Sequence, residues 1–443
     1  MSETEAAARS GEVLTGGHRE RVLPVVPAGA GTRAGRLDRV GGSGRGGAQQ
    51  ASLREHNLSL VLRAIVEAPA PTTRARLATG LGVTRATASD LVDRLIDARL
   101  VDQLTPELRS GAGRPGMLLA PAARTVVGLG LEVQVDHLGV RATDLTGALV
   151  AEARRDGDFR ASTPATVLRQ VARLAAPIVD GLSGSVTIAG ACVSLPALLR
   201  HGSGIVQLAP NLGWHDVDVI SALARHPALQ GFPLMLGNDA DLASRAEVRA
   251  LALADRTNRD AQSFLYLAGE VGIGGAIVIA GELARGQHGW SGEIGHAVIE
   301  RDGPLCGCGA RGCLEQYAGR DVIMRGAGLA LDAPVETLLE AASRPGRARA
   351  SLGSAADAIG VAVATTLNLV DVERVVLGGI YAHLFEHLRE GILAQVGERV
   401  LAARWSPVEV GPARAGAGAS LAGAGLRVLD DVVAHPSAWI AGR

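Results

Sequence analysis

The spacing of apolar residues changes several times along the chain and divides it into segments of different kinds. Residues 1–48 are rich in Gly, Ala and Arg and show no helical or strand periodicity, which predicts a disordered tail. From Gln50 apolar residues recur at helical spacing as far as Pro69 and Pro71. The helix must end there, because proline cannot continue it.

The next segment predicts two short helices and a hairpin. TTRARLATGLGVTRATASDLVDRLIDARLV contains a helix, a Gly-Leu-Gly turn and a second helix with one apolar face. Thr72 or Thr73 is placed to cap the first helix, and Thr84 lies near the start of the second. LVDQLTPELRSGAGRPGMLLAP then predicts two strands joined by an arginine-containing tip. Residues 49–121 therefore indicate a winged helix-turn-helix that binds DNA.

Exposed polar residues of this motif are the candidate DNA contacts. The start of a recognition helix reaches base edges, whereas wing arginines reach phosphates or the minor groove. The alternative is a helical hairpin that contacts another protein. The candidates are Thr84, Arg85, Thr87 and Ser89 on the second helix and Arg109 and Arg114 in the wing.

After Pro121 the pattern predicts an α/β domain that repeats its own architecture. Up to about Leu253 the pattern predicts three antiparallel strands, which are followed in order by a helix, a strand, another helix, a strand and a helix. A similar order begins again at Gln262, with a strand, a glycine-rich bend and a second strand. Two such halves predict a duplicated fold with a cleft between them over residues 122–433, followed by a C-terminal tail at 434–443.

Composition narrows the class of protein. The chain has 443 residues, of which 47% are hydrophobic and 20% charged, which is typical of a globular protein with more than one domain. A net charge of −1 supplies no overall basic field, so any DNA contact needs a local patch. The absence of a long apolar run and of a secretory leader predicts a cytoplasmic protein with no membrane contact.

Three of the four cysteines lie close together in the sequence and share a spacing with one histidine. One imidazole and three thiols at loop spacing are typical of a closed structural zinc site, although clustered thiols are also found in redox sites. Cys192 lies in an apolar run and is predicted to be a core residue. Glu293 and Glu315 flank the cluster as spare carboxylates, which suggests a loop that positions a ligand. The proposed zinc ligands are His296, Cys306, Cys308 and Cys313.

The segments GEIGH and CGCGARGCLEQY, preceded by APNLGW and GNDADLASRAE, resemble the ROK family of sugar kinases and sugar-responsive repressors. The resemblance implies a two-lobed actin- and hexokinase-like (ribonuclease H-like) domain, and the N-terminal motif extends it to the regulator branch. It also implies that Asp239 matches the base of the kinases. The sugar-binding positions that it implies are Asn211, Asn238, Asp239, Glu293, His296 and Glu315.

The nucleotide-binding half departs from the family pattern. The family's first phosphate loop reads Asp-x-Gly-Gly-Thr, whereas this chain has Glu132-Val133-Gln134-Val135. The second loop keeps its glycines but has Glu270 where threonine is usual, and a carboxylate there should repel phosphate. The residues assigned to these degenerate nucleotide loops, retained glycines included, are Glu132, Gln134, Glu270, Gly272, Gly274, Gly378 and Gly379.

These features predict a sugar-responsive transcription regulator, a repressor that binds a double-stranded DNA operator as a homodimer or dimer of dimers. Zinc would be its structural cofactor and a sugar its effector. One alternative is an active sugar kinase that uses ATP and magnesium and carries an accessory DNA-binding head. Another is a zinc-stabilised protein-interaction module that binds neither sugar nor nucleotide.

Overall fold

The computed structural model describes residues 44–105, 117–160, 162–200, 202–254 and 262–441. Contacts between residues divide the chain into two units, Met1–Gln49 and Gln50–Arg443. The greater part of the tail predicted at residues 1–48 lies outside the described residues. The division between a DNA-binding domain and a sugar-binding domain at residue 121 stays a prediction.

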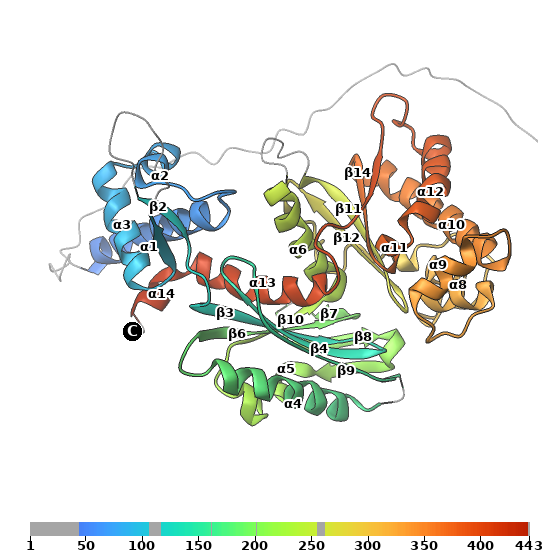
Figure 1. The fold of residues 1–443 in the computed structure, drawn as a ribbon, viewed down its shortest axis with the longest axis horizontal. Coiled ribbons are helices and arrows are strands. Elements are labelled where there is room, and N and C mark those ends of the chain that lie inside the picture. The colour runs from blue at the N-terminus through green and yellow to red at the C-terminus, as the bar shows by residue number, and fades with distance from the viewer. Residues whose placement is uncertain (1–43, 106–116, 161, 201, 255–261, 442–443) are drawn as a thin grey trace, which may run out of the picture. The chain divides into compact units, whose positions relative to one another are not determined.

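The N-terminal elements follow the predicted order of three helices and a hairpin (Figure 1). Thr73 caps the second helix by accepting the Arg76 N–H, and Thr84 caps the third by accepting the Thr87 N–H. Gly82 ends the second helix in the left-handed region, at φ 67°, where glycine carries no Cβ penalty. The elements are α1 (Gly44–Val66), α2 (Arg74–Leu81), α3 (Arg85–Asp97), β1 (Val101–Leu104) and β2 (Leu118–Pro121).

The first lobe is a five-stranded sheet in the order β10-β6-β3-β4-β5. Its first three strands in sequence are antiparallel neighbours, whereas β6 and β10 run parallel to β3. Helix α4 packs its apolar face on this sheet. The elements are β3 (Val126–Val133), β4 (His137–Asp144), β5 (Leu149–Asp156), α4 (Pro164–Leu182), β6 (Thr187–Leu195), β10 (Leu234–Asn238) and α6 (Asp239–Ala254).

The second lobe repeats this topology with the order β13-β12-β11-β14-β15. Here β11, β12 and β13 are antiparallel neighbours, and β14 and β15 run parallel to β11. The predicted duplication is therefore confirmed at the level of strand order and direction. The elements are β11 (Phe264–Gly269), β12 (Ile273–Ile279), β13 (Glu282–Leu283), α7 (Glu315–Ala318), α8 (Arg320–Ala327), α9 (Val335–Ala342), α10 (Arg347–Val370), β14 (Arg374–Gly379), α11 (Ile380–His383), α12 (Phe385–Arg399) and β15 (Glu409–Pro412).

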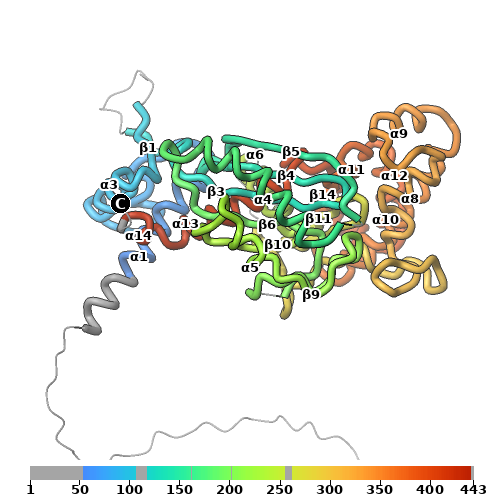
Figure 2. The backbone as a smooth tube through the Cα atoms, turned by 90° about the horizontal axis from the view of Figure 1, so that it is seen from below, coloured from blue at the N-terminus to red at the C-terminus, as the bar shows by residue number. Residues whose placement is uncertain are grey.

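Two regions hold more structure than the sequence pattern predicted. Where one helix was expected before residue 232, a three-stranded sheet precedes the short helix α5. Residues 434–443, assigned to a tail, contain the helix α14, which lies beside α3 in both ribbon and tube views (Figures 1 and 2). The elements are β7 (Leu198–Arg200), β8 (Ile205–Ala209), β9 (Trp214–Asp218), α5 (Val219–Ala224), α13 (Ala419–Ala434) and α14 (Pro436–Ala441), with short 3-10 turns at Pro210–Leu212, Pro227–Leu229 and Ile294–His296.

Among the described residues, one helix is long and apolar enough to cross a membrane by composition alone. This is α10, and 56% of its most apolar window is buried inside the protein. It packs against α12, its neighbour in Figure 2. Helix α10 is therefore accounted for as a core element of the second lobe.

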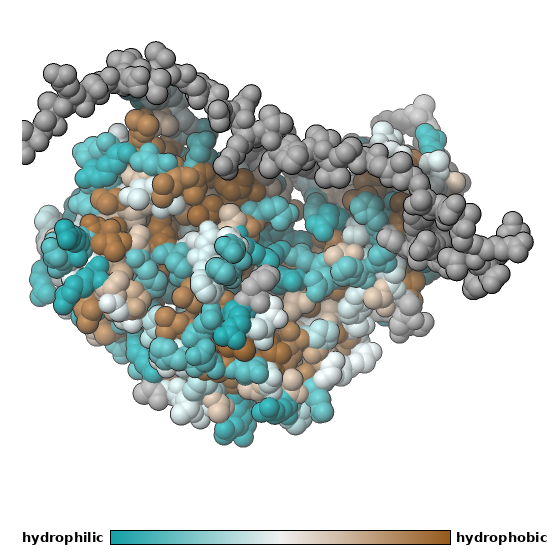
Figure 3. All heavy atoms as spheres, turned by 180° about the vertical axis from the view of Figure 1, so that it is seen from behind, coloured by the Kyte–Doolittle hydropathy of each residue, from teal (hydrophilic) through white to brown (hydrophobic). Residues whose placement is uncertain are grey.

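On the face drawn in Figure 3, apolar and polar side chains are interspersed over the surface.

Helix α13 packs at backbone distance against two other elements. A Cβ on Gly423 would lie 1.7 Å from the carbonyl oxygen of Leu242 in α6. On the sheet side, a Cβ on Gly130 of β3 would lie 2.3 Å from the carbonyl oxygen of Leu421. Only glycine allows these approaches, because any side chain would separate the helix from its neighbours.

We expect Gly423→Ala to destabilise the protein by roughly 1–3 kcal/mol, because the added methyl group forces α13 away from α6. Urea denaturation followed by circular dichroism measures the change in free energy of unfolding. The matched control is Gly353→Ala in α10, where a Cβ would meet nothing within 4 Å. That control should be neutral or stabilising by about 0.5–1 kcal/mol, because alanine is the better helix former. Equal effects of the two changes would contradict the packing argument.

Candidate functional site

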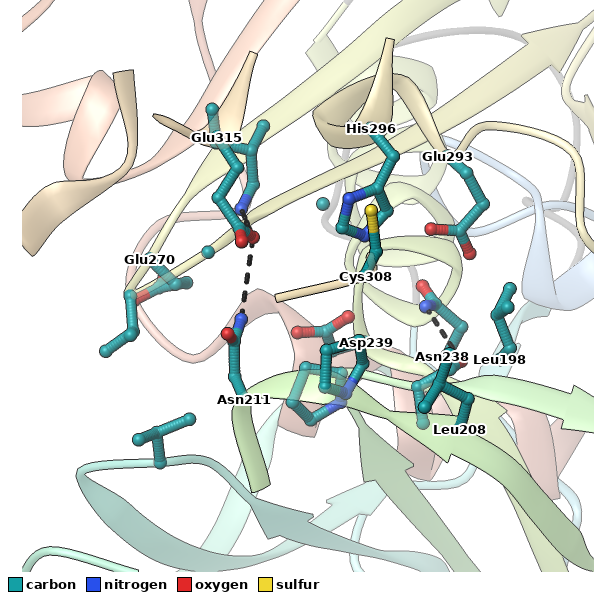
Figure 4. Close-up of a pocket in the computed structure, with 18 of the residues that line it drawn as sticks. Leu198, Leu208, Asn211, Asn238, Asp239, Glu270, Glu293, His296, Cys308 and Glu315 are labelled. Carbon is teal, nitrogen blue, oxygen red and sulfur yellow. Dashed lines mark hydrogen bonds between the residues drawn. The ribbon is translucent and has the colours of Figure 1, made fainter. Parts of the chain in front are cut away.

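A polar pocket lies at the carboxyl end of β10, between residues of the two lobes (Figure 4). Asn238 ends β10 and Asp239 begins α6, so both side chains are fixed by the strand-to-helix junction. The lining residues with polar side chains are Gln134, Asn211, Asn238, Asp239, Glu270, Glu293, His296, Cys308 and Glu315. The structure thus brings together all six predicted sugar-binding residues.

Asn238 has a structural role as well as a place in the pocket. Its side-chain oxygen accepts the backbone N–H groups of Ala240 (2.9 Å) and Asp241 (3.2 Å) and so caps α6. Its amide nitrogen donates to the carbonyl oxygen of Ala197 at 3.3 Å. Because an amide nitrogen carries two protons, one N–H remains for a ligand hydroxyl.

Glu315 and Asn211 form one side of the pocket. Asn211 Nδ2 donates to Glu315 Oε2 at 3.5 Å, and the backbone N–H of Ile273 donates to the same oxygen at 3.3 Å. A Cβ on Gly272 would lie 2.3 Å from Glu315 Oε2, so glycine is required where the loop passes this carboxylate. Glu315 is therefore held by the second glycine-rich loop, with its other oxygen directed to the cysteine cluster, 3.9 Å from Cys306 Sγ.

Glu293 faces Asn238 from the opposite side of the pocket (Figure 4). Desolvation, followed by the charges of Asp239 and Asp241, raises the pKa of Glu293 to about 7. Desolvation is also the main cause that raises the pKa of Asp239 above its ordinary value, against the hydrogen bond from Gln134. Carboxylates and amides around a space of this kind suit vicinal hydroxyls, which both donate and accept hydrogen bonds.

The cysteine cluster has the geometry of a tetrahedral zinc site. The ligand atoms of the four predicted residues all lie within 4.8 Å of one another. Cys308 Sγ and Cys313 Sγ are 3.7 Å apart, and Cys306 Sγ is 3.7 Å from His296 Nδ1. Zinc–sulfur bonds of about 2.3 Å at tetrahedral angles require a sulfur–sulfur separation of about 3.8 Å. The donor set and its spacing therefore fit zinc, which would be held through Nδ1 of His296.

The side chain of Gln134, in the turn between β3 and β4, lines the pocket and contacts Asp239. Gln134 Nε2 donates to Asp239 Oδ2 at 2.9 Å, and the Gln134 backbone N–H donates to the His137 carbonyl oxygen at 2.9 Å. The carboxylate that matches the kinase base thus accepts a hydrogen bond from this chain's own amide. The turn has a bulky side chain where a phosphate-binding loop needs glycine for close backbone approach.

A buried charge network lies next to this turn. His137 Nε2 lies 3.1 Å from Glu132 Oε2, and His137 Nδ1 lies 2.7 Å from Asp136 Oδ1. Burial alone would lower the pKa of His137, but the two carboxylate partners outweigh it and raise the pKa to about 9. Asp136 also accepts from Arg320 Nη1 of the second lobe at 3.5 Å, so the network links the lobes.

Glu270 occupies the second phosphate loop. Its burial, followed by the charges of Glu132 and Asp136, raises the pKa of Glu270 to about 8. Gly379 of β14 lies beside it, since a Cβ on Gly379 would lie 2.7 Å from Glu270 Oε1. A Cβ on the preceding residue, Gly378, would lie 2.1 Å from the Tyr266 hydroxyl. Glu270 is therefore a buried carboxyl group with Glu132 and Asp136 as charged neighbours.

Sequence reasoning located the altered loop but missed the roles of His137, Asp136 and Arg320. The pair Asp136-His137, four and five residues after Glu132, was a visible signal, because a histidine near two carboxylates can form an ion-pair network. Arg320 gave no such signal, since it is distant in sequence from Asp136 and meets it only in the folded chain.

The candidate DNA contacts on α3 lie where the prediction placed them. Arg85 and Thr87 are exposed in the first turn of α3, and Ser89 is half-buried. Thr84 shares its hydroxyl with the cap of α3, 2.8 Å from the Thr87 hydroxyl. Arg109 and Arg114 lie outside the described residues.

Comparison with known proteins shows which proteins the chain is similar to. A family model described as "ROK family" matches residues 129–430. A xylose repressor of Bacillus subtilis (strain 168) is 29% identical over 280 residues, which cover 63% of this chain and 69% of the relative. An N-acetylmannosamine kinase of Citrobacter koseri is 30% identical over 267 residues, covering 58% of this chain and 86% of the relative.

One solved structure shares the architecture over most of the chain. It is described as a ROK family transcriptional regulator homologous to the MLC protein of E. coli. The TM-score is 0.71 at 20% identity, with 88% of this chain and all of the other covered. At this identity the likeness supports the fold, including the N-terminal helical region, and no finer property.

We expect purified protein to contain about one zinc ion per chain and Cys308→Ser to lose it. Without the metal, the segment that carries Glu293 and Glu315 should exchange amide hydrogens faster, and sugar affinity should fall by about tenfold or more. Elemental analysis measures the zinc content, and mass spectrometry of hydrogen exchange measures the exchange of that segment. Cys192→Ala is the control, since that thiol is buried in the first lobe and should leave the zinc content unchanged. Faster exchange in α2 and α3 would contradict a local role.

The raised pKa of His137 predicts a pH-dependent contribution to stability. Because the folded-state value of about 9 exceeds the ordinary 6.5, this contribution is complete below about pH 6.5 and is lost as the pH rises through 9. The difference in free energy of unfolding between wild type and His137→Gln should therefore shrink by about 3 kcal/mol between pH 6 and pH 10. Denaturation at several pH values measures it. A constant difference, or an imidazole that titrates near 6.5 by NMR, would reject the charged network.

Proposed function

This chain belongs to the ROK family, and we propose that it is a sugar-responsive DNA-binding transcriptional regulator, a repressor, rather than a sugar kinase. Residues 49–121 would bind operator DNA, and residues 122–433 would bind a neutral sugar or sugar derivative. Xylose repressors are among its relatives, which supports the regulator branch. The specific sugar and the operator sequence are left to experiment.

The hydrogen bond from Gln134 to Asp239 carries the proposal. A kinase base must be free to accept the proton of the attacking sugar hydroxyl, and the nucleotide phosphates need neutralising groups. Here Gln134 already donates to Asp239, and the loops that would hold phosphates carry Glu132, Gln134 and Glu270 in place of the family's residues. The sugar-binding side keeps its full set of polar groups. This combination favours recognition without phosphoryl transfer.

Zinc would act as a structural brace in this scheme. Its ligands lie on the same loop as Glu293 and immediately before Glu315, so the metal would fix both carboxylates relative to the pocket. His296 would coordinate through Nδ1, which leaves its other ring nitrogen toward the pocket it lines. The metal would supply rigidity and no reactive group.

The C-terminal helices offer a route by which sugar binding reaches the DNA-binding head. Helix α13 packs on α6, whose first residue is Asp239, and α14 continues from it to α3. The backbone N–H of Ser437 donates to Glu55 of α1 at 3.3 Å, and Trp439 packs into the core that contains Leu58 and Leu95. A change at the start of α6 would therefore be transmitted through packed helices to the head.

As a homodimer the protein would present two recognition helices to a palindromic operator, with half-sites about one helical turn or a multiple apart. Thr84, Arg85, Thr87 and Ser89 would supply base-edge contacts, and Arg109 and Arg114 phosphate or minor-groove contacts. A sugar that weakens DNA binding must itself bind the DNA complex less tightly, because the coupling is reciprocal.

We expect the effector sugar to release the protein from its operator and Asp239→Asn to abolish that release, because the variant loses a charged hydrogen-bond acceptor in the pocket. Sugar affinity should fall by about tenfold or more. Gel shifts with genomic fragments, repeated with a panel of hexoses and pentoses, measure release, and calorimetry measures sugar binding. Asp239→Asn should retain operator binding in the absence of sugar.

The converse variant separates the two functions. Arg85→Ala should weaken operator binding by about tenfold and leave sugar binding intact, whereas Arg169→Ala, an exposed arginine on α4, should alter neither. Failure of every genomic fragment to form a specific complex would reject the regulator. Sugar-dependent ADP release that is abolished by Asp239→Asn would instead establish the kinase alternative, which rests on the retained Asp239.

A further inference from the structure

A second cavity adjoins the sugar pocket on the other side of Asn238, a residue that lines both. It lies between the edge strand β10, helix α6, strand β7 and the segment after β13. Its volume is about 470 Å³, which falls in the range of small-molecule sites. Neither the metal cluster nor the nucleotide loops contribute to its wall.

Positive charge predominates in this cavity. Four arginines from four different elements line it, together with one carboxylate, Asp241. Desolvation raises the pKa of Asp241 to about 7, so near neutral pH it offsets less than one of the positive charges. The arginines are Arg200 at the end of β7, Arg245 in α6, Arg285 after β13 and Arg427 in α13.

Two of the arginines form salt bridges within the fold, and the other two are exposed at the cavity, where Arg285 also acts on the charge of Asp241. Arg245 forms a salt bridge with Asp430, and Arg427 forms one with Asp431 at 2.8 Å. Over the described part of the chain, Arg200 and Arg285 form no salt bridge, and both are exposed at the cavity. Like charges that converge from separate elements repel one another, so their arrangement is costly unless an anion joins them.

Guanidinium groups select a particular kind of anion. Their planar, forked donors match the oxygens of a phosphate group in bidentate geometry, and the charge assists each hydrogen bond. His288, which also lines the cavity, adds a further ring donor. Leu199, Leu234 and Leu283 supply apolar walls that would accommodate a carbon skeleton attached to the phosphate.

We propose that this arginine-lined cavity is a phosphate-binding site whose occupancy is coupled to the sugar pocket through Asn238 and the first turn of α6. The phosphate would belong either to the effector itself or to a separate phosphorylated metabolite. Phosphate binding stands independently of the proposed function, whereas the coupling rests on sugar binding at the neighbouring pocket.

The first turn of α6 provides the coupling because it faces both spaces. Asp239 lines the sugar pocket and Asp241 lines the arginine cavity, two residues apart on the same helix. Asn238 caps that helix through the N–H groups of Ala240 and Asp241, so movement of its amide on either side disturbs both walls. Arg427 further connects the cavity to α13 and so to the helices that reach the head.

Calorimetry on the full-length protein in a phosphate-free buffer tests the site, with inorganic phosphate, pyrophosphate and a hexose 6-phosphate as probes. We expect saturable binding of at least one probe. The double variant Arg200→Gln with Arg285→Gln should bind it at least about tenfold more weakly. Both side chains are exposed, so the variant should fold, and a thermal melt checks this. The matched control is Arg169→Gln with Arg173→Gln, two exposed arginines on α4, and should bind as wild type does.

The probes also separate the two sources of phosphate. A hexose phosphate that competes with the neutral effector sugar places the phosphate on the effector. Inorganic phosphate or pyrophosphate that binds without displacing the sugar identifies a second ligand. The proposal is overturned if no probe binds saturably, if the double variant binds as wild type does, or if the control loses affinity equally. Sugar and operator binding that persist in that case leave the proposed function standing.

Discussion

A buried carboxylate must accept hydrogen bonds, and the donors to Asp239 are the constraint on which the arrangement of this pocket depends. The strand-to-helix junction after β10 places Asp239 in the cleft, where desolvation opposes its charge. Its oxygens accept from the backbone N–H of Ala240 and from the Gln134 amide, both at 2.9 Å. In a phosphoryl-transfer enzyme that position must serve a substrate hydroxyl. Here the fold itself supplies one of the donors to Asp239.

The same logic of charge and desolvation explains the surroundings of Asp239. Glu132 and Asp136 would be costly so near the cleft without a cation, and His137 supplies one because both ring nitrogens face carboxylate oxygens. Arg320 adds a second cation from the other lobe. These four side chains therefore satisfy one another's charges within the protein. Glu293 and Glu315 line the pocket together with His296 and Cys308 of the cysteine cluster.

Close backbone packing joins α6, which begins at the binding site, to α13 and to the first sheet. Gly423 and Gly425 of α13, with Gly128 and Gly130 of β3, allow the helix to touch both the first sheet and α6. Because α13 leads directly into α14, this last helix lies against α3 and donates a hydrogen bond to Glu55 of α1. The N-terminal helices and the first lobe therefore share one hydrophobic core. This shared core gives a physical basis for coupling between an effector and an operator.

The sequence by itself determined the elements and the chemistry that local spacing controls. Apolar periodicity predicted the duplicated order of strands and helices but placed a helix where β7, β8 and β9 lie. Thr73 and Thr84 marked helix starts, and His296 with three cysteines defined a candidate metal site. Only the tertiary structure decided the long-range pairings: Gln134 on Asp239, Arg320 on Asp136, α14 on α3, and four arginines around one cavity. The reason is physical. Capping and periodicity act within a few residues, whereas a buried charge finds its partner wherever the folded chain brings one.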